Sequence, residues 1–157
     1  MVPGALAFKR LGSQLSEQML TFLQTHRDLL PLVKGGGVLV HSDFKPVNLL
    51  WSEVNRLTVL DWEFAHSGHA LFDFGILLRH YLDFPLRLND LEKGYVEAGG
   101  SLPDNWLHIA RLLDFVNIIQ LLNTSGERPE LFTSLIKSAQ LTISAWDNLD
   151  SRLNLPC

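Results

Sequence analysis

The sequence is poor in the features that mark several large classes of protein. Its 157 residues include one cysteine, Cys157, which excludes an internal disulfide framework and a zinc site made of cysteines. No apolar run reaches the length of a membrane span, and the first residues lack the charged-then-apolar order of a signal peptide. The net charge of −4 argues against a nucleic acid as the main partner. We therefore expect a soluble, cytoplasmic protein with neither a membrane nor a nucleic acid as its partner.

Glycine motifs that hold phosphate groups are absent as well. The sequence contains no G-x-G-x-x-G. The three glycines at 35–37 are not followed by the lysine and hydroxyl residue of a P-loop. We interpret residues 34–37 as a flexible connector.

Hydrophobic residues make up 46% of the chain, enough for the core of a single domain over residues 1–157. Apolar positions at steps of three and four residues predict an amphipathic helix over 13–30, closed by Pro31. Residues 38–65 hold three short apolar runs, and 52–56 is the expected turn of a hairpin. Beyond residue 70 the patterns predict helices over 72–83, 89–98, 104–123 and 130–150. The fold class is therefore α+β and mostly α, with a small β-hairpin region.

Two of the later helices carry further signals. Asn89 and Glu92 have the spacing of a capping box at the start of one helix, and Gly99-Gly100 would end it. The helix over 104–123 is apolar on most of its faces. Such a helix is expected to be buried on nearly all sides.

Residues 41–50 carry the strongest functional signal. His41, Asp43 and Asn48 fit the pattern H-x-D-x-x-x-x-N of kinase catalytic loops, with an apolar run on either side. A further apolar run at 57–60 leads directly into Asp61. A lone H-x-D is often an ordinary turn, but the full pattern followed by a strand that ends in aspartate is rare by chance.

This arrangement suits phosphoryl transfer from ATP, which needs magnesium at the phosphates and a carboxylate that orients the attacking hydroxyl. Magnesium prefers oxygen ligands. Asp43 would face the acceptor hydroxyl, Asn48 would give its amide oxygen to the metal, and Asp61 would be the main metal carboxylate. A hairpin over 49–60 folds Asp61 back towards Asn48, so that this spacing can bring both residues to one metal ion.

Two more residues of the loop are grouped with Asp43 as catalytic. Lys45 could reach a transferred phosphate as a point charge. His41 is expected to buttress the loop rather than react.

A literal D-F-G occurs at Asp73-Phe74-Gly75, twelve residues after Asp61 and at the start of a helix. We assign Asp73 to support of the catalytic loop, not to the metal. Glu63 either supports the metal site or faces solvent. His66 and His69 are expected to be loop histidines, because no third metal ligand lies near them in the sequence.

From residue 38 to 79 the sequence resembles the aminoglycoside phosphotransferase and choline kinase-like family. The resemblance rests on the segments 38–51 and 57–79, above all on Trp62 and Glu63 after Asp61 and on the later Gly68 and Asp73. It implies a protein-kinase-like fold with ATP as co-substrate and Mg²⁺ as cofactor. It also implies that Asp43 is the catalytic base, that Asn48 and Asp61 bind magnesium and the nucleotide phosphates, and that Asp73 stabilises the loop.

The sequence departs from the family at two places. Lys45 stands where the family often has histidine, which widens the range of substrates. Only forty residues precede His41, and Lys9 is a weak candidate for the phosphate-binding lysine of an N-terminal lobe. The chain therefore resembles the C-terminal lobe alone, with the N-terminal lobe missing, and is expected to be a fragment or a shortened homologue.

Two functions remain open at this point. One is an ATP-dependent phosphotransferase acting on a hydroxyl of a small molecule. The other is an inactive, kinase-derived module that binds a ligand or partner. Acidic residues after the hairpin could line a pocket for a cationic acceptor, although such charges more often form a solvated helix face: Asp83, Asp90, Glu92, Glu97, Asp104 and Asp114. An exposed upper face of the cleft would favour self-association.

Overall fold

The structure is a computed structural model that describes residues 4–33, 37–54, 56–80 and 88–149. No helix in these ranges is long and apolar enough to cross a membrane. The α-helices are α1 (Ala5–His26), α2 (Leu71–Arg79), α3 (Leu88–Glu97), α4 (Trp106–Leu122) and α5 (Pro129–Ala145). The strands are β1 (Val38–Val40), β2 (Leu49–Trp51), β3 (Leu57–Val59) and β4 (His66–Gly68). Short 3₁₀ helices cover Arg27–Val33, Pro46–Asn48 and Trp146–Asn148.

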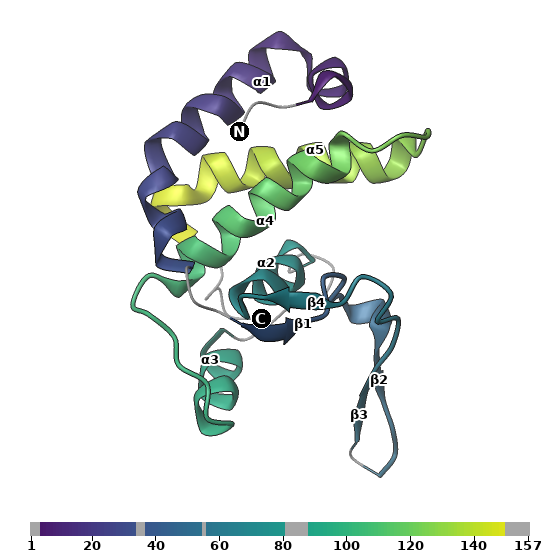
Figure 1. Cartoon of the computed structure of the whole chain (residues 1–157), viewed down its shortest axis with the longest axis vertical. Helices are drawn as coiled ribbons and strands as arrows, with labels where there is room; N and C mark the ends of the chain where they lie inside the picture. The colour runs from purple at the N-terminus through teal and green to yellow at the C-terminus, as the bar shows by residue number, and fades with distance from the viewer. Residues whose placement is uncertain (1–3, 34–36, 55, 81–87, 150–157) are drawn as a thin grey trace.

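The described strands form two antiparallel pairs. β2 and β3 make a hairpin in which Leu49 faces Val59, and it projects from the helices in Figure 1. Its turn is closed by a 3.0 Å hydrogen bond from the Ser52 N–H to the Arg56 carbonyl. β1 pairs with β4, so that Val40 faces His66. The mostly helical fold with a small strand region is confirmed, whereas β4 was not expected from its sequence.

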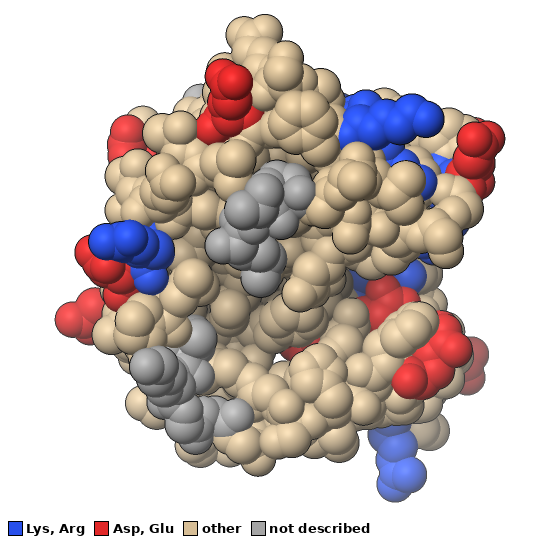
Figure 2. All heavy atoms as spheres, turned by 45° about the horizontal axis from the view of Figure 1, so that its top comes forward, with Lys and Arg blue, Asp and Glu red and all other residues tan. Residues whose placement is uncertain are grey.

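The helices gather around α4, which packs against α1, α2 and α5. Figure 1 shows α1, α5 and α4 stacked above α2 and the strands. The expected burial of α4 is confirmed, because Leu112, Phe115 and Ile118 on it are fully buried. Each such side chain contributes about 1.5–3 kcal/mol through removal from water. Charged residues on the face shown in Figure 2 are sparse and lie mostly at its edges.

The N-terminal helix is longer than its pattern predicted. α1 begins at Ala5 and contains a kink at Gly12, whose φ of 74° is accessible to glycine. Lys9 therefore lies in a helix, and the idea that it belongs to a phosphate-binding strand is wrong. The α-helix ends at His26, and Pro31 lies within the following 3₁₀ helix.

The first segment of α1 is tied to the end of α4 by Arg10. Its guanidinium donates to the carbonyl oxygens of Leu122, Thr124 and Gly126 at 2.6, 2.7 and 2.8 Å. It also lies 3.8 Å from the centre of the Phe132 ring on α5. A cation at the carbonyl end of a helix is stabilising, so Arg10 fastens three helices together.

The ends of α3 match the sequence signals in part. The helix already includes Leu88, so Asn89 lies in its first turn and the expected capping box is wrong. The C-terminal signal is correct: Gly99 has a φ of 90°, and the Gly100 N–H donates to the Tyr95 carbonyl at 2.9 Å. The connector 34–36 and the stretch 81–87, which includes Asp83, lie outside the described residues.

Gly75 permits the close approach of α2 and α4. A Cβ at this position would lie 2.2 Å from the Ala110 carbonyl oxygen, a backbone atom that cannot turn away. We expect Gly75→Ala to lower the free energy of unfolding by about 1–3 kcal/mol through overpacking, as measured by urea denaturation. The matched control is Gly94→Ala in α3, where no atom lies within 4 Å of the added Cβ. It should stabilise by about 0.5–1 kcal/mol, and equal effects of the two changes would contradict this role of Gly75.

Candidate active site

The loop after β1 is held by the carboxylate of Asp73 in the first turn of α2. Its two oxygens accept hydrogen bonds from the backbone N–H groups of His41 at 2.7 Å and Ser42 at 2.8 Å. Ser42 has a φ of 68°, which is uncommon for a residue with a side chain. Such backbone persists where its surroundings hold it and is often found at functional sites. Within the D-F-G triplet, Asp73 thus binds the loop backbone and Phe74 is buried in the core.

His41 joins the loop to the strand before Asp61. Its ring is 2% exposed, and Nε2 lies 2.7 Å from the Leu60 carbonyl oxygen. Nδ1 accepts the Asp43 N–H at 3.2 Å, so Nε2 carries the proton that is donated to Leu60. Both ring nitrogens of His41, which was grouped with the catalytic residues, are engaged with backbone and the residue is buried; this fits the expectation that His41 buttresses the loop rather than reacts.

Asp43, Lys45 and Asn48 form one connected group. The Asn48 Nδ2 donates to the backbone carbonyl of Asp43 at 2.9 Å and to its carboxylate at 3.0 Å. Lys45 Nζ lies 2.7 Å from the Asp43 carboxylate. These contacts use the amide nitrogen of the buried Asn48 and leave its amide oxygen as the atom that could bind a cation.

The hairpin brings Asp61 back to the loop. Leu49 pairs with Val59, and the Leu60 N–H donates to the Asn48 carbonyl at 2.9 Å. Asp61, one residue further on, is exposed and has a φ of 65°. Both Ser42 and Asp61 thus adopt backbone that L-residues rarely adopt, at the two segments that carry the predicted site.

The other candidate residues from the sequence lie in β4, at the start of α2 and in an exposed turn. His66 lies in β4, and its Nδ1 is 2.9 Å from Ser42 Oγ. His69 Nδ1 accepts the Leu71 N–H at 3.2 Å at the start of α2, and burial lowers the pKa of His69. Glu63 is exposed in a turn. The described residues contain no cluster of three or more His, Cys, Asp or Glu that could hold a metal.

A cavity of about 460 Å³ opens beside the loop. Ser42, Asp43 and Lys45 line one part of it, Phe64 and His66 a second part, and α2, α4 and α5 supply most of the remainder, including Arg79, Asn117 and Ser134. This size falls in the range of pockets for small molecules. None of the described acidic residues proposed for a cationic pocket lines it. Asp90, Glu92, Glu97 and Asp104 are exposed, which fits the alternative of solvated charges, and Asp114 is buried.

Asp114 belongs to a buried network that the sequence reading missed. Its carboxylate accepts from Arg79 Nε at 2.9 and 3.2 Å and from Arg79 Nη2, and Arg111 Nη1 lies 3.5 Å away. Arg111 also donates to Thr142 Oγ1 on α5. Burial lowers the pKa of Arg111; Asp114 opposes this and Arg79 adds to it. Charged residues at 111 and 114 inside a mostly apolar helix were the available signal.

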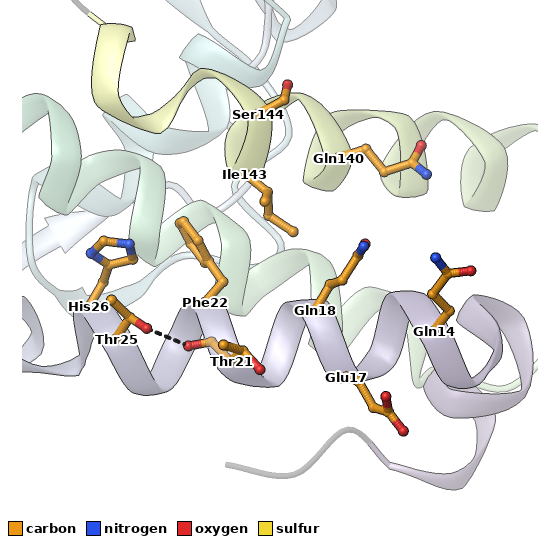
Figure 3. A pocket seen from close by; sticks show the side chains of 10 residues that line it. All are labelled: Gln14, Glu17, Gln18, Thr21, Phe22, Thr25, His26, Gln140, Ile143 and Ser144. Carbon is orange, nitrogen blue, oxygen red and sulfur yellow. Dashed lines mark hydrogen bonds between the residues drawn. The ribbon is translucent and has the colours of Figure 1, made fainter.

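A second hollow of about 700 Å³ lies between α1 and α5 (Figure 3). The side chains of Gln14 and Gln18 extend from α1 towards Gln140 and Ile143 of α5. Glu17 is the one carboxylate among its described lining residues, and none of the loop residues reaches it. We therefore place the candidate active site at the catalytic loop.

A family model described as "Phosphotransferase enzyme family" matches residues 4–129, which is more than half of the chain. The chain belongs to this family. The resemblance inferred from the catalytic loop and hairpin is thereby confirmed. The match includes the loop, the hairpin and α2 to α4.

One relative with a curated description is a chicken (Gallus gallus) protein named acyl-CoA dehydrogenase family member 11. It is 38% identical over 60 residues, which cover 37% of this chain and 8% of that protein. The chain therefore spans a small part of the relative that it matches. No solved structure matches the chain.

The residues at the loop fit a magnesium ion in their chemistry. Asn48 offers an amide oxygen and Asp61 a carboxylate, both hard oxygen ligands. Magnesium commonly binds one or two such groups and completes its shell with phosphates and water. A site of this kind does not need the cluster of three acidic or imidazole ligands that the described residues lack.

Proposed function

We propose that this segment is the catalytic part of an ATP-dependent phosphotransferase that acts on a hydroxyl of a small molecule. The observation that carries the proposal is the tie of the Asp73 carboxylate to the His41 and Ser42 backbone. This tie holds the loop whose Asp43 lines the cavity. The hairpin brings the chain at Asp61 back towards Asn48. Family membership supports the transfer of a phosphoryl group.

In the proposed reaction Asp43 orients the acceptor hydroxyl and accepts its proton as the oxygen attacks the terminal phosphorus of ATP, whose bond to the bridging oxygen breaks so that ADP leaves. Lys45, 2.7 Å from Asp43, can turn to the transferred phosphate and offset its charge. Asn48 and Asp61 would hold magnesium. The ion, when bound, neutralises charge on the nucleotide phosphates.

The nucleotide would lie against the strands. Large apolar side chains are exposed there: Leu39, Leu50, Trp51, Leu57, Trp62 and Phe64. Among the described residues, a single strand precedes the loop. We propose that this apolar face is the lower wall of the nucleotide site and that, uncovered, it favours self-association.

The proposal predicts magnesium-dependent but weak binding of ATP by this 157-residue chain. The described residues offer the phosphates neither a glycine-rich loop nor a lysine from an upper lobe, so affinity and alignment both suffer. We expect a Kd weaker than about 10 μM in isothermal titration with ATP and Mg²⁺, and weaker binding still with EDTA. Asp61→Asn should remove most of the difference that magnesium makes.

The matched control is Asp28→Asn, which changes a carboxylate that is 95% exposed on a distant 3₁₀ helix. It should leave the magnesium effect intact. ATP binding that is indifferent to magnesium in the unchanged chain would contradict the phosphotransferase proposal and favour a binding module. Binding tighter than about 10 μM would show that this chain holds a complete nucleotide site.

A further inference from the structure

The cavity beside the loop is positively charged, although the chain as a whole carries a net charge of −4. Lys45, Arg79 and Arg128 line it, and Asp43 is its one carboxylate among the described residues. Lys45 is paired with Asp43, so the remaining positive charge comes from Arg79 and Arg128. A cavity of one sign attracts ligands of the opposite sign.

The network of ion pairs to which Arg79 belongs also carries more positive than negative charge. Arg79 and Arg111 share a single carboxylate, Asp114, which is fully buried. Among the described residues, the two guanidinium groups of this network face one carboxylate, so the network carries one positive charge in excess. Buried charge is costly unless it is paired, so a bound anion would stabilise this arrangement.

Arg79 is held in a geometry that suits an anion. Its Nε and Nη2 point to Asp114, and this two-point contact fixes the plane of the guanidinium. None of the hydrogen bonds between described residues uses Nη1, and Arg79 lines the cavity. Arg128, anchored to Thr124 Oγ1 at 3.0 Å, lines the same cavity from the start of α5.

We infer that the acceptor is an anionic hydroxy compound, whose carboxylate or phosphate binds Arg79 and Arg128 while its hydroxyl faces Asp43. This inference rests on the proposed function for the placement of the hydroxyl. Amide and hydroxyl groups of Asn117, Gln120 and Ser134 add polar contacts along the cavity. A cationic acceptor would meet Arg79, which shares Asp114 with Arg111, and Arg128, whose described hydrogen-bond partner is neutral, so the excess of positive charge disfavours it.

The test is a titration of the 157-residue chain with four small probes in low-salt buffer, without nucleotide or magnesium. The probes are glycerol, glycerate, glycerol 3-phosphate and choline, which are neutral, carboxylate, phosphate and cationic alcohols. We expect glycerate or glycerol 3-phosphate to bind at least about 10-fold more tightly than glycerol and choline, the effect of one charge-assisted hydrogen bond. The stronger of the two anions identifies the anionic group.

Variants locate the site. Arg128→Gln should weaken binding of the preferred anion about 10-fold or more. Arg79→Lys keeps the charge beside Asp114 but removes the planar fork, and it should also weaken binding. The control is Lys137→Gln, which removes one positive charge from an exposed position of α5 outside the cavity and should leave the Kd unchanged.

Equal or tighter binding of choline or glycerol would overturn the inference. So would an equal loss in Arg128→Gln and Lys137→Gln, which would indicate general attraction to the surface, or the absence of any binding below about 10 mM. Asp61→Asn should leave anion binding unchanged, because Asp61 does not line the cavity. The anion titration and the ATP titration can therefore fail independently.

Discussion

Replacing Asp43 by asparagine is expected to lower kcat by about 10²–10⁴-fold, the range for loss of a positioned general base. The test uses an enzyme that contains this segment together with a functional nucleotide site, and follows ADP release. Asparagine keeps the size of the side chain and an oxygen that can accept from Asn48 Nδ2, now 3.0 Å from the carboxylate. The KM for the acceptor should rise far less than kcat falls, because the lost interaction forms mainly as the hydroxyl attacks.

Two controls separate chemistry from folding in this experiment. Glu63→Gln changes an exposed carboxylate two residues after Asp61 and should leave kcat within a few-fold if Glu63 faces solvent. The melting temperature of Asp43→Asn should stay close to that of the parent protein. An unchanged kcat in Asp43→Asn would remove Asp43 from the mechanism.

The catalytic loop and hairpin could be predicted because their determinants are local. His41, Asp43 and Asn48 lie within eight residues, and the short apolar runs on either side become β1, β2 and β3. A hairpin with a turn at 52–56 pairs neighbouring runs without help from distant parts of the chain. The predicted roles of these residues in catalysis still await the experiments described above.

Features that depend on distant partners could not be predicted. β4 consists of His66, Ser67 and Gly68, which have little preference for strands, and it is ordered by pairing with β1. A Cβ on Gly68 would lie 2.9 Å from a methyl group of Val40, so glycine permits this close pairing. Likewise, Arg10 contacts carbonyl groups more than a hundred residues away, which no local pattern reveals.

The residues that line the cavity could not be predicted for a related reason. A helix presents different residues to solvent and to its neighbours, and only packing decides which ones reach a pocket. Asp114 turned out to be fully buried against Arg79, while Arg128 from a loop after α4 lines the cavity. Counting acidic residues along the chain therefore cannot give the charge of the cavity.

Removal of the Asp114 charge is expected to have the largest effect on stability. Asp114→Asn keeps the shape of the side chain but removes the one carboxylate that pairs with Arg79 and Arg111 among the described residues. Breaking a buried ion pair in this way costs about 3–5 kcal/mol. We expect a loss of this size in the free energy of unfolding, measured by urea denaturation followed by circular dichroism. Asp104→Asn, at an exposed carboxylate, is the control and should change stability by less than about 0.5 kcal/mol.

Arg111 is the second guanidinium group that shares the Asp114 carboxylate. Arg111→Met leaves Arg79 and Asp114 as a one-to-one pair and removes the guanidinium whose pKa burial lowers. Thr142 Oγ1 keeps its 3.0 Å hydrogen bond to the Ser138 carbonyl. Arg111→Met should therefore cost less than half as much as Asp114→Asn, because replacing a buried charge by an apolar side chain of similar size is often close to neutral. If both variants lose the same stability, the network is balanced in charge, and the anion in the cavity is not needed to complete it.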